Sequence, residues 1–299
     1  MDDYPLDTNS TDERNIISLA NYGVNNALVI GKYHYKSARE GLDSHLHKDI
    51  IEICYCHKGQ QVYEVNGKTY CIRGGDVFVA FPNEIHSTGM QPEEKGILYW
   101  LLIEACPGKS FFQFDKEESA VFLHTLTSLP RRHFRGSVEM RRTLESIFGT
   151  TKRQRGKMQK IILENLIVSF LIQVIDVAGG ASDHMSQVPE NRVKIEQFID
   201  GNYKESLSIE VMACMLNLSE SRFKSWFKDQ FGVPPLEFIL RKRIQEAKRI
   251  MQSEKYVNMS TIAYDLGFSS PQHFATMFRR YTSLSPKEFK ASVASVVEV

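Results

Sequence analysis

Two segments in the last third of the chain repeat one pattern, and this repeat constrains the fold more than any other feature. They read IEVMACMLNLSESRFKSWFKDQF from residue 209 and MSTIAYDLGFSSPQHFATMFRRY from residue 259. Each carries a small residue, Ala213 or Ala263, four positions before a residue that tolerates a left-handed turn, Asn217 or Gly267. A small residue where two helices cross, followed by a tight turn, is what helix-turn-helix packing requires.

A second helix is predicted after each turn. Ser219 starts it in the first copy, and Ser270, followed by Pro271 at the first helical position, starts it in the second. Aromatic residues then recur at the spacing of one buried helix face and leave an outward polar face. In a single copy that face could be an ordinary solvated surface. The shared register of the two copies favours a binding surface instead.

The second segment resembles the signature of the AraC/XylS family of bacterial transcription regulators. IAYDLGFSSPQHFATMFRRYTSLSPKEF follows the pattern I-A-x3-G-F-x5-F-x3-F-[KR]-x6-P-x-x-[FY], and the first segment matches more loosely, with Asn217 replacing the glycine. The resemblance implies a DNA-binding domain at residues 191–292, with one long helix at about residues 235–252 between its two helix-turn-helix units. It also implies two recognition helices in successive major grooves, roughly 34 Å apart.

The same resemblance assigns contacts to promoter or operator DNA. Glutamine can pair with adenine through two hydrogen bonds, and lysine or arginine suits guanine. Phosphate contacts position a protein without specifying a sequence. The expected base-edge readers are Ser221, Arg222, Lys224, Ser225, Gln272, His273 and Thr276. The expected phosphate contacts are Lys228, Arg279 and Arg280.

Residues 25–103 read as short strands separated by polar turns, which is typical of a β-barrel or sandwich. Asn66-Gly67 between QVYEV and KTYCIR predicts a tight type I′ hairpin. The segment from His45 to Ser87 resembles the cupin-type sensor domain that many AraC/XylS regulators carry ahead of their DNA-binding part.

The stretch DSHLHKDIIEICYCHKG, residues 43–59, contains two histidines and a carboxylate at the spacing of a cupin enzyme. His45, His47 and Glu52 fit the first half of that pattern, but the second half fits poorly and has His86 one residue early. On a strand, the first two histidines share a face, whereas Glu52 needs a turn or bulge around Lys48-Asp49 to join them.

Three interpretations of His45, His47, Glu52 and His86 remain open. They could hold Fe, Mn or Zn, line a site for a small hydroxylated ligand, or serve as satisfied structural residues. We expect ligand lining, with no metal and no cofactor, because the degraded motif and the attached DNA-binding unit argue against catalysis. The thiols of Cys54, Cys56 and Cys71 could add a soft-metal or redox site, although small buried thiols are commoner.

Residues 157–177 are apolar nearly all round and predict a mostly buried helix that contributes to a homodimer. A membrane span would need a longer run with fewer polar groups. The net charge is only +1, so any positively charged surface that binds nucleic acid must be confined to one part of the protein. An odd count of five cysteines without a CxxC motif, and an N-terminus without a secretory signal, favour the reducing cytoplasm.

Together these features predict a multidomain α+β protein. Its parts are a flexible acidic N-terminus (1–20), a cupin-like β-barrel that senses a ligand (21–112), a helical dimerisation region (113–180), a linker (181–190) and an all-α double helix-turn-helix domain (191–292). The expected function is a non-enzymatic transcription activator that binds a sugar or related metabolite and acts with RNA polymerase. The alternatives are a cupin metalloenzyme fused to a DNA-binding module, and a regulator without a ligand.

Overall fold

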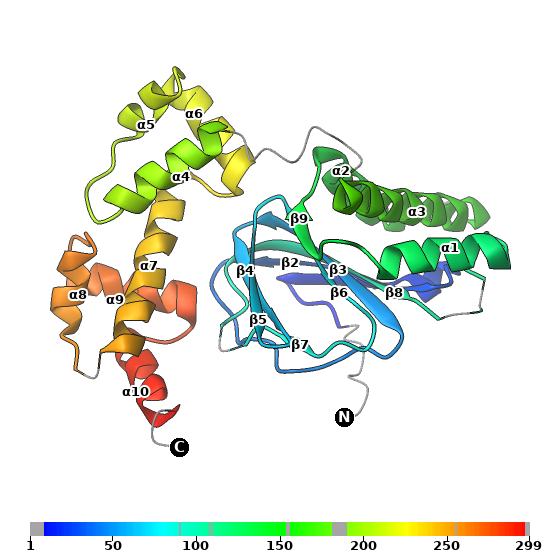
Figure 1. The fold of residues 1–299 in the computed structure, drawn as a ribbon, viewed down its shortest axis with the longest axis horizontal. Coiled ribbons are helices and arrows are strands. Elements are labelled where there is room, and N and C mark those ends of the chain that lie inside the picture. Colours follow the sequence, from blue (N-terminus) through cyan, green and yellow to red (C-terminus); the bar gives the residue numbers. More distant parts are fainter. Residues whose placement is uncertain are drawn as a thin grey trace. The chain divides into compact units, whose positions relative to one another are not determined.

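The computed structural model describes residues 9–89, 91–106, 108, 110–153, 156–180, 190–254 and 256–296. The chain divides into two compact units. Unit 1 comprises Met1–Tyr35, Gly41–Met90 and Gly96–Ser186, and unit 2 comprises Lys36–Glu40, Gln91–Lys95 and Gln187–Val299. Strands dominate the first unit and helices the second, as the sequence predicts (Figure 1).

Two antiparallel sheets form the predicted β-barrel of the first unit. The larger has the order β1-β2-β8-β3-β6-β9, and the smaller has the order β5-β4-β7. The strands are β1 Arg14–Ser18, β2 Ala27–Tyr35, β3 Ile50–Lys58, β4 Gln60–Val65, β5 Lys68–Arg73, β6 Asp76–Ala80, β7 His86–Ser87, β8 Gly96–Glu104 and β9 His133–Arg135. The predicted hairpin is confirmed, because Asn66 and Gly67 have φ values of 50° and 73° between paired strands β4 and β5.

Side-chain alternation along β3 separates two cores. Ile51 and Ile53 belong to a large core that also includes the helices of this unit. Cys54 and Cys56 belong to a second, inner core that draws on both sheets. Successive strand residues face opposite sides, so Glu52 has the parity of the inner face.

The described part of the first unit also contains the short 3-10 helix Leu19–Tyr22 and three α-helices: α1 Lys116–Thr127, α2 Val138–Thr151 and α3 Lys157–Gly179. Helix α3 is long and apolar enough to cross a membrane by length and composition, and 44% of that window is buried here. One face packs into the large core with its side chains fully buried, at Leu163, Ile167, Phe170, Leu171, Val174 and Ala178. The opposite side exposes Met158, Ile161 and Ile172, so burial is less complete than predicted.

The prediction of a flexible terminus over residues 1–20 is wrong for its second half, because β1 pairs with β2 and Leu19 is fully buried, where apolar side chains interrupt the acidic stretch. The predicted helical region 113–180 contains α1, α2 and α3, and it also contains strand β9, which extends the larger sheet by pairing with β6. Residues 1–8 and the predicted linker, except Glu190, lie outside the described residues.

The second unit contains the predicted pair of helix-turn-helix motifs. Its helices are α4 Glu190–Asn202, α5 Ile209–Met215, α6 Glu220–Phe231, α7 Pro235–Ser253, α8 Met259–Asp265, α9 Pro271–Thr282 and α10 Pro286–Val296. The first motif is α5–α6 and the second is α8–α9, and each has its own aromatic core. Helix α7 is the predicted long connecting helix and contributes side chains to both cores.

Candidate functional site

The turns of both helix-turn-helix motifs have the geometry that the sequence predicts. Asn217 and Gly267 have φ values of 54° and 76°, in the left-handed region. Ser219 caps α6 by accepting a hydrogen bond from the backbone N–H of Arg222 at 3.4 Å. Ser270 caps α9 in the same way through the N–H of His273 at 3.1 Å. Each cap satisfies an N–H group that a helix start leaves without an intrahelical partner.

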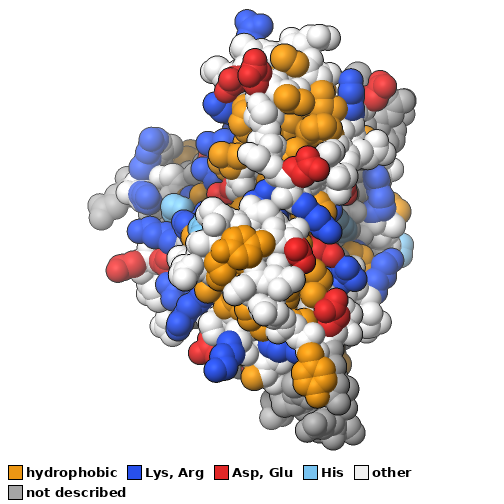
Figure 2. Space-filling view, turned by 90° about the vertical axis from the view of Figure 1, so that its left-hand side faces the viewer, with side chains coloured by type: hydrophobic (Ala, Val, Ile, Leu, Met, Phe, Trp, Pro, Cys, Tyr) orange, Lys and Arg blue, Asp and Glu red, His pale blue; other side chains and the backbone are white. Residues whose placement is uncertain are grey.

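The outward faces of α6 and α9 carry every residue assigned to DNA contact. All of these side chains are exposed: Ser221, Arg222, Lys224, Ser225, Lys228, Gln272, His273, Thr276, Arg279 and Arg280. On the opposite faces Phe223, Phe227, Phe274 and Phe278 are almost fully buried. The space-filling view in Figure 2 shows Lys and Arg side chains at many separate points rather than in one basic patch, which accords with the low net charge.

Three histidines of the first unit, His45, His47 and His86, lie close together, but the first two are not on the strand that the sequence suggested for them. His45 and His86 form an isolated antiparallel bridge, with N–H to C=O distances of 3.0 and 2.9 Å. The predicted turn at Lys48-Asp49 is confirmed, with φ of 54° at Asp49. Asn83 holds this turn, because its side-chain oxygen accepts the N–H of Asp49 at 3.2 Å. The turn brings Glu52 to the histidines.

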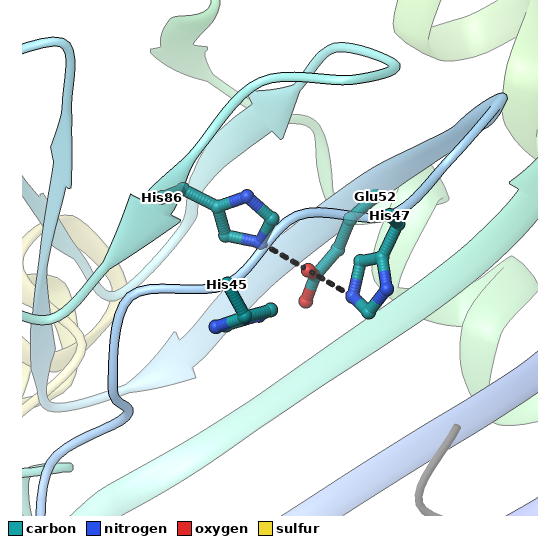
Figure 3. Close-up of side chains that lie close together, drawn as sticks. All are labelled: His45, His47, Glu52 and His86. Carbon is teal, nitrogen blue, oxygen red and sulfur yellow. Dashed lines mark hydrogen bonds and ion pairs between the residues drawn. The ribbon is translucent and has the colours of Figure 1, made fainter. Parts of the chain in front are cut away.

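His45, His47, Glu52 and His86 offer ligand atoms that all lie within 4.8 Å of one another (Figure 3). The Glu52 carboxylate lies between two rings, with Oε2 at 3.0 Å from His86 Nε2 and 3.7 Å from His47 Nε2. His47 and His86 are buried, whereas His45 is half-buried. This group is called the histidine–glutamate cluster below.

The cluster shifts the pKa values of its own members. Burial works against ionisation of Glu52, but the hydrogen bond from His86 and the nearby rings outweigh it and lower the pKa of Glu52 to about 2. The same carboxylate raises the pKa of His86 against the opposing effect of burial. Burial lowers the pKa of His45. Glu52 is therefore a carboxylate near neutral pH, available to a cation or to a hydroxyl donor.

Three buried side chains of the barrel, Tyr33, Gln61 and Tyr63, were not predicted from sequence, and Tyr63 lies beside the cluster. Tyr63 donates a hydrogen bond to Cys54 Sγ at 3.2 Å, and Cys54 Sγ lies 3.4 Å from Glu52 Oε1. Tyr33 donates to Gln61 Oε1 at 3.3 Å. The alternation of Gln61, Tyr63 and Val65 along β4 was the available signal, since these residues share one strand face.

The thiols give no support to a soft-metal or redox site. Cys54 and Cys56 are buried, and burial raises the pKa of Cys54 well above its usual value. A thiolate is the form that binds metals and reacts with oxidants. Among the described residues, the group arranged to hold a metal contains no cysteine.

Comparison with known proteins gives two family matches. The family described as the AraC-like ligand binding domain matches residues 33–106, and a family described as a helix-turn-helix domain matches residues 212–292. The first match contains the histidine–glutamate cluster and the second contains both proposed DNA-reading helices. These domains define a ligand-binding transcription regulator.

Individual relatives match most of the chain at low sequence identity. The arabinose operon regulatory protein of Escherichia coli is 23% identical over 78% of this chain and 78% of its own. The transcriptional activator RhaS of Escherichia coli is 20% identical over 82% of this chain and 86% of its own. The solved structure of ToxT from Vibrio cholerae matches 94% of this chain and 98% of its own, with 12% identity and a TM-score of 0.35. Through its two domains the chain belongs to the AraC/XylS family.

Proposed function

We propose that this protein activates transcription from specific promoters when a sugar or related polyhydroxylated metabolite binds inside its barrel. The observation that carries this proposal is the inner polar set, which comprises the histidine–glutamate cluster and the neighbouring Tyr63. A carboxylate accepts hydrogen bonds from ligand hydroxyls, and imidazole and tyrosine groups can both donate and accept. The name of the arabinose-operon relative supports the sugar class. Sensing is proposed rather than catalysis, because the barrel is attached to a DNA-binding domain.

The proposal places this regulator in the cytoplasm as a homodimer that contacts RNA polymerase at its promoters. Helix α3 supports the dimer, because it exposes Met158, Ile161 and Ile172. The last two are eleven residues apart and so lie on one helix stripe, because eleven residues complete about three turns. Large apolar side chains exposed on one side of a helix are typical of a protein–protein contact.

The dimer is tested by replacing both Ile161 and Ile172 with glutamate. The exposed stripe can take the charges without disturbing the core, so the variant should fold but lose half of its mass in light scattering. A matched double substitution on exposed positions of another helix, Ala120→Glu with His124→Glu on α1, should leave the mass unchanged. A folded Ile161→Glu/Ile172→Glu variant with the wild-type mass would exclude this stripe as the contact.

DNA recognition is tested by selecting bound sequences from random double-stranded DNA with the full-length protein. The enriched sites should contain two short conserved blocks about one helical turn apart, because two recognition helices read successive major grooves. A variant that combines Gln272→Ala with Lys224→Ala should give weaker enrichment. Selection that returns no common sequence would contradict the proposed function.

The effector is tested by thermal denaturation against a panel of pentoses, hexoses and deoxyhexoses. A sugar that binds only the folded protein must raise the melting temperature in proportion to its concentration. His47→Ala and His86→Ala should abolish that rise, whereas His124→Ala, on an exposed position of α1, should keep it. Identical responses in all four proteins would assign the cluster histidines a structural role.

A further inference from the structure

The ring orientations in the histidine–glutamate cluster are fixed by backbone carbonyl groups. His45 Nδ1 lies 2.7 Å from the carbonyl oxygen of Asp43, and His86 Nδ1 lies 3.0 Å from that of Glu84. A carbonyl oxygen only accepts hydrogen bonds, so each Nδ1 carries the hydrogen. In neutral His45 the Nε2 atom is then the nitrogen whose lone pair can bind a cation, and in His86 the same atom can bind one by exchanging the proton that it shares with Glu52. Metal-binding histidines commonly have their second nitrogen held in this way.

A further contact holds the segment that supplies His86. Arg132 donates two hydrogen bonds to the Glu84 carboxylate, at 2.7 and 2.8 Å. The same carboxylate accepts the backbone N–H of Phe81 at 3.0 Å. A bidentate arginine–carboxylate pair fixes geometry more strictly than a single hydrogen bond. The carbonyl that orients His86 is therefore anchored to the segment that leads into β9.

The spacing of the four donors suits one ion. Metal–nitrogen bonds of about 2.1 Å place donors on opposite sides of an ion about 4.2 Å apart, and neighbouring donors closer. In the cluster, all four ligand atoms lie within 4.8 Å of one another, so small side-chain rotations bring them to bonding distance. Three imidazoles with one carboxylate suit first-row transition metals rather than Mg²⁺ or Ca²⁺, which prefer oxygen.

We propose that His45, His47, His86 and Glu52 bind one divalent first-row transition-metal ion. Three neutral imidazoles and one carboxylate leave the bound ion with a net positive charge. Its remaining coordination positions would accept oxygen atoms of the effector. This last step rests on the proposed function, whereas metal binding itself does not. The four ligands come from the segment before β3, from β3 and from β7, so the ion would link three parts of the barrel.

The test is titration of the full-length protein with Co²⁺ after removal of metals with EDTA and dialysis. We expect saturation at one Co²⁺ ion per chain. The bound ion should show the weak visible absorption bands that are typical of Co²⁺ with nitrogen and oxygen ligands. The intense near-ultraviolet absorption of a cobalt–thiolate bond should be missing. Calorimetric titration with Zn²⁺ should give the same stoichiometry, and the melting temperature should rise with metal concentration.

Two variants identify the ligands. Glu52→Gln keeps the side-chain shape and His45→Ala changes a half-buried position, so both should fold. Each should weaken Zn²⁺ binding by at least about 100-fold, since loss of a ligand should exceed the 10–100-fold cost of losing an outer hydrogen-bond partner. The control is His34→Ala, an exposed histidine on β2 that lies outside the cluster, and it should retain wild-type affinity.

Three outcomes would overturn the metal proposal: no saturable binding by the wild type, equal affinity in Glu52→Gln and His45→Ala, or a thiolate spectrum. Each sample is also assayed for binding to the selected DNA. Metal-free protein that binds DNA specifically, but never binds Co²⁺ or Zn²⁺, defeats this inference and leaves the proposed function intact. Protein that binds one metal ion per chain but shows no preference for the selected DNA contradicts the proposed function and leaves the metal inference intact.

Discussion

The two helix-turn-helix units have the same geometry with different residues at the turn. In the first, Asn217 donates its backbone N–H to Cys214 and Leu218 donates to Ala213, both at 3.0 Å. In the second, Gly267 donates to Tyr264 and Phe268 to Ala263, both at 2.9 Å. The hydrogen-bond register is therefore identical, although one turn uses asparagine and the other glycine.

The surroundings of the two turns explain this difference. A Cβ atom at Gly267 would overlap the carbonyl oxygen of Lys204, which packs directly against the second turn. Arg243 of α7 reinforces this contact by donating to the carbonyl oxygens of Tyr203 at 2.7 Å and Glu205 at 2.8 Å, and to that of Gly267. Backbone conformation alone therefore permits either residue, and close packing makes glycine necessary in the second unit.

The largest effect should come from Gly267→Ala. The methyl group meets the Lys204 carbonyl, and the left-handed backbone adds strain, so unfolding free energy should fall by at least about 2 kcal/mol. Urea denaturation of the full-length protein, followed by tryptophan fluorescence and circular dichroism, measures the loss. Gly179→Ala, at the end of α3 where a Cβ has open space, is the control. Equal stability of both variants would refute the packing explanation.

The next largest effect should distinguish the DNA-contacting face of α9 from that of α6. Gln272→Ala should cost about 1–3 kcal/mol on the selected DNA site and relax the preference for adenine at one or two positions of a single block. Lys224→Ala, on α6, should relax the preference for guanine in the block of the DNA site that α6 reads.

The phosphate contact should behave differently. Arg279→Ala should weaken binding to selected and random DNA alike, and it should lower the slope of the salt dependence of binding by about one unit. Titrations at several salt concentrations with both DNAs provide the measurement. Equal losses for Gln272→Ala on both DNAs would remove this side chain from the base edges.

A smaller effect is expected from Arg243→Lys. Lysine keeps the charge but cannot reproduce the fork that reaches three carbonyl groups, so stability should fall by about 1–2 kcal/mol. Arg249→Lys, on an exposed position of the same helix, should leave the melting temperature unchanged. The selected DNA should also be bound more weakly by Arg243→Lys, because the guanidinium links the second turn to the segment before α5. An unchanged melting temperature would show that the three carbonyl contacts add nothing.

The smallest effect concerns Asn217. Asn217→Gly relieves the left-handed strain but increases the freedom of the unfolded chain, so the two changes should nearly cancel, within about 0.5 kcal/mol. Asn217→Ala retains the strain without the tolerance of asparagine for this conformation and should cost about 1 kcal/mol. Denaturant midpoints compare the three proteins. A larger loss in the glycine variant than in the alanine variant would mean that the asparagine side chain itself stabilises the turn.

The sequence alone determined the features whose residues are near one another along the chain. Helical periodicity, two serine caps and two left-handed turn residues were sufficient to locate α5, α6, α8 and α9 and to separate their buried and exposed faces. The Asn66-Gly67 hairpin and the turn before Glu52 were found for the same reason. In each case, the backbone geometry and side-chain spacing of a few neighbouring residues determine the local structure.

Tertiary structure decided the features whose residues are far apart. The terminal segment at Arg14 became strand β1 because β2 offered it a hydrogen-bonding edge, and β9 was recruited to the edge of β6. His86 faces Glu52 across 34 positions of sequence, and the smaller sheet that carries His86 also brings Tyr63 to Cys54, beside Glu52. Composition and periodicity carry no information on which strands pair. The partners of a buried polar group depend on that pairing, so only the folded chain defines the cluster.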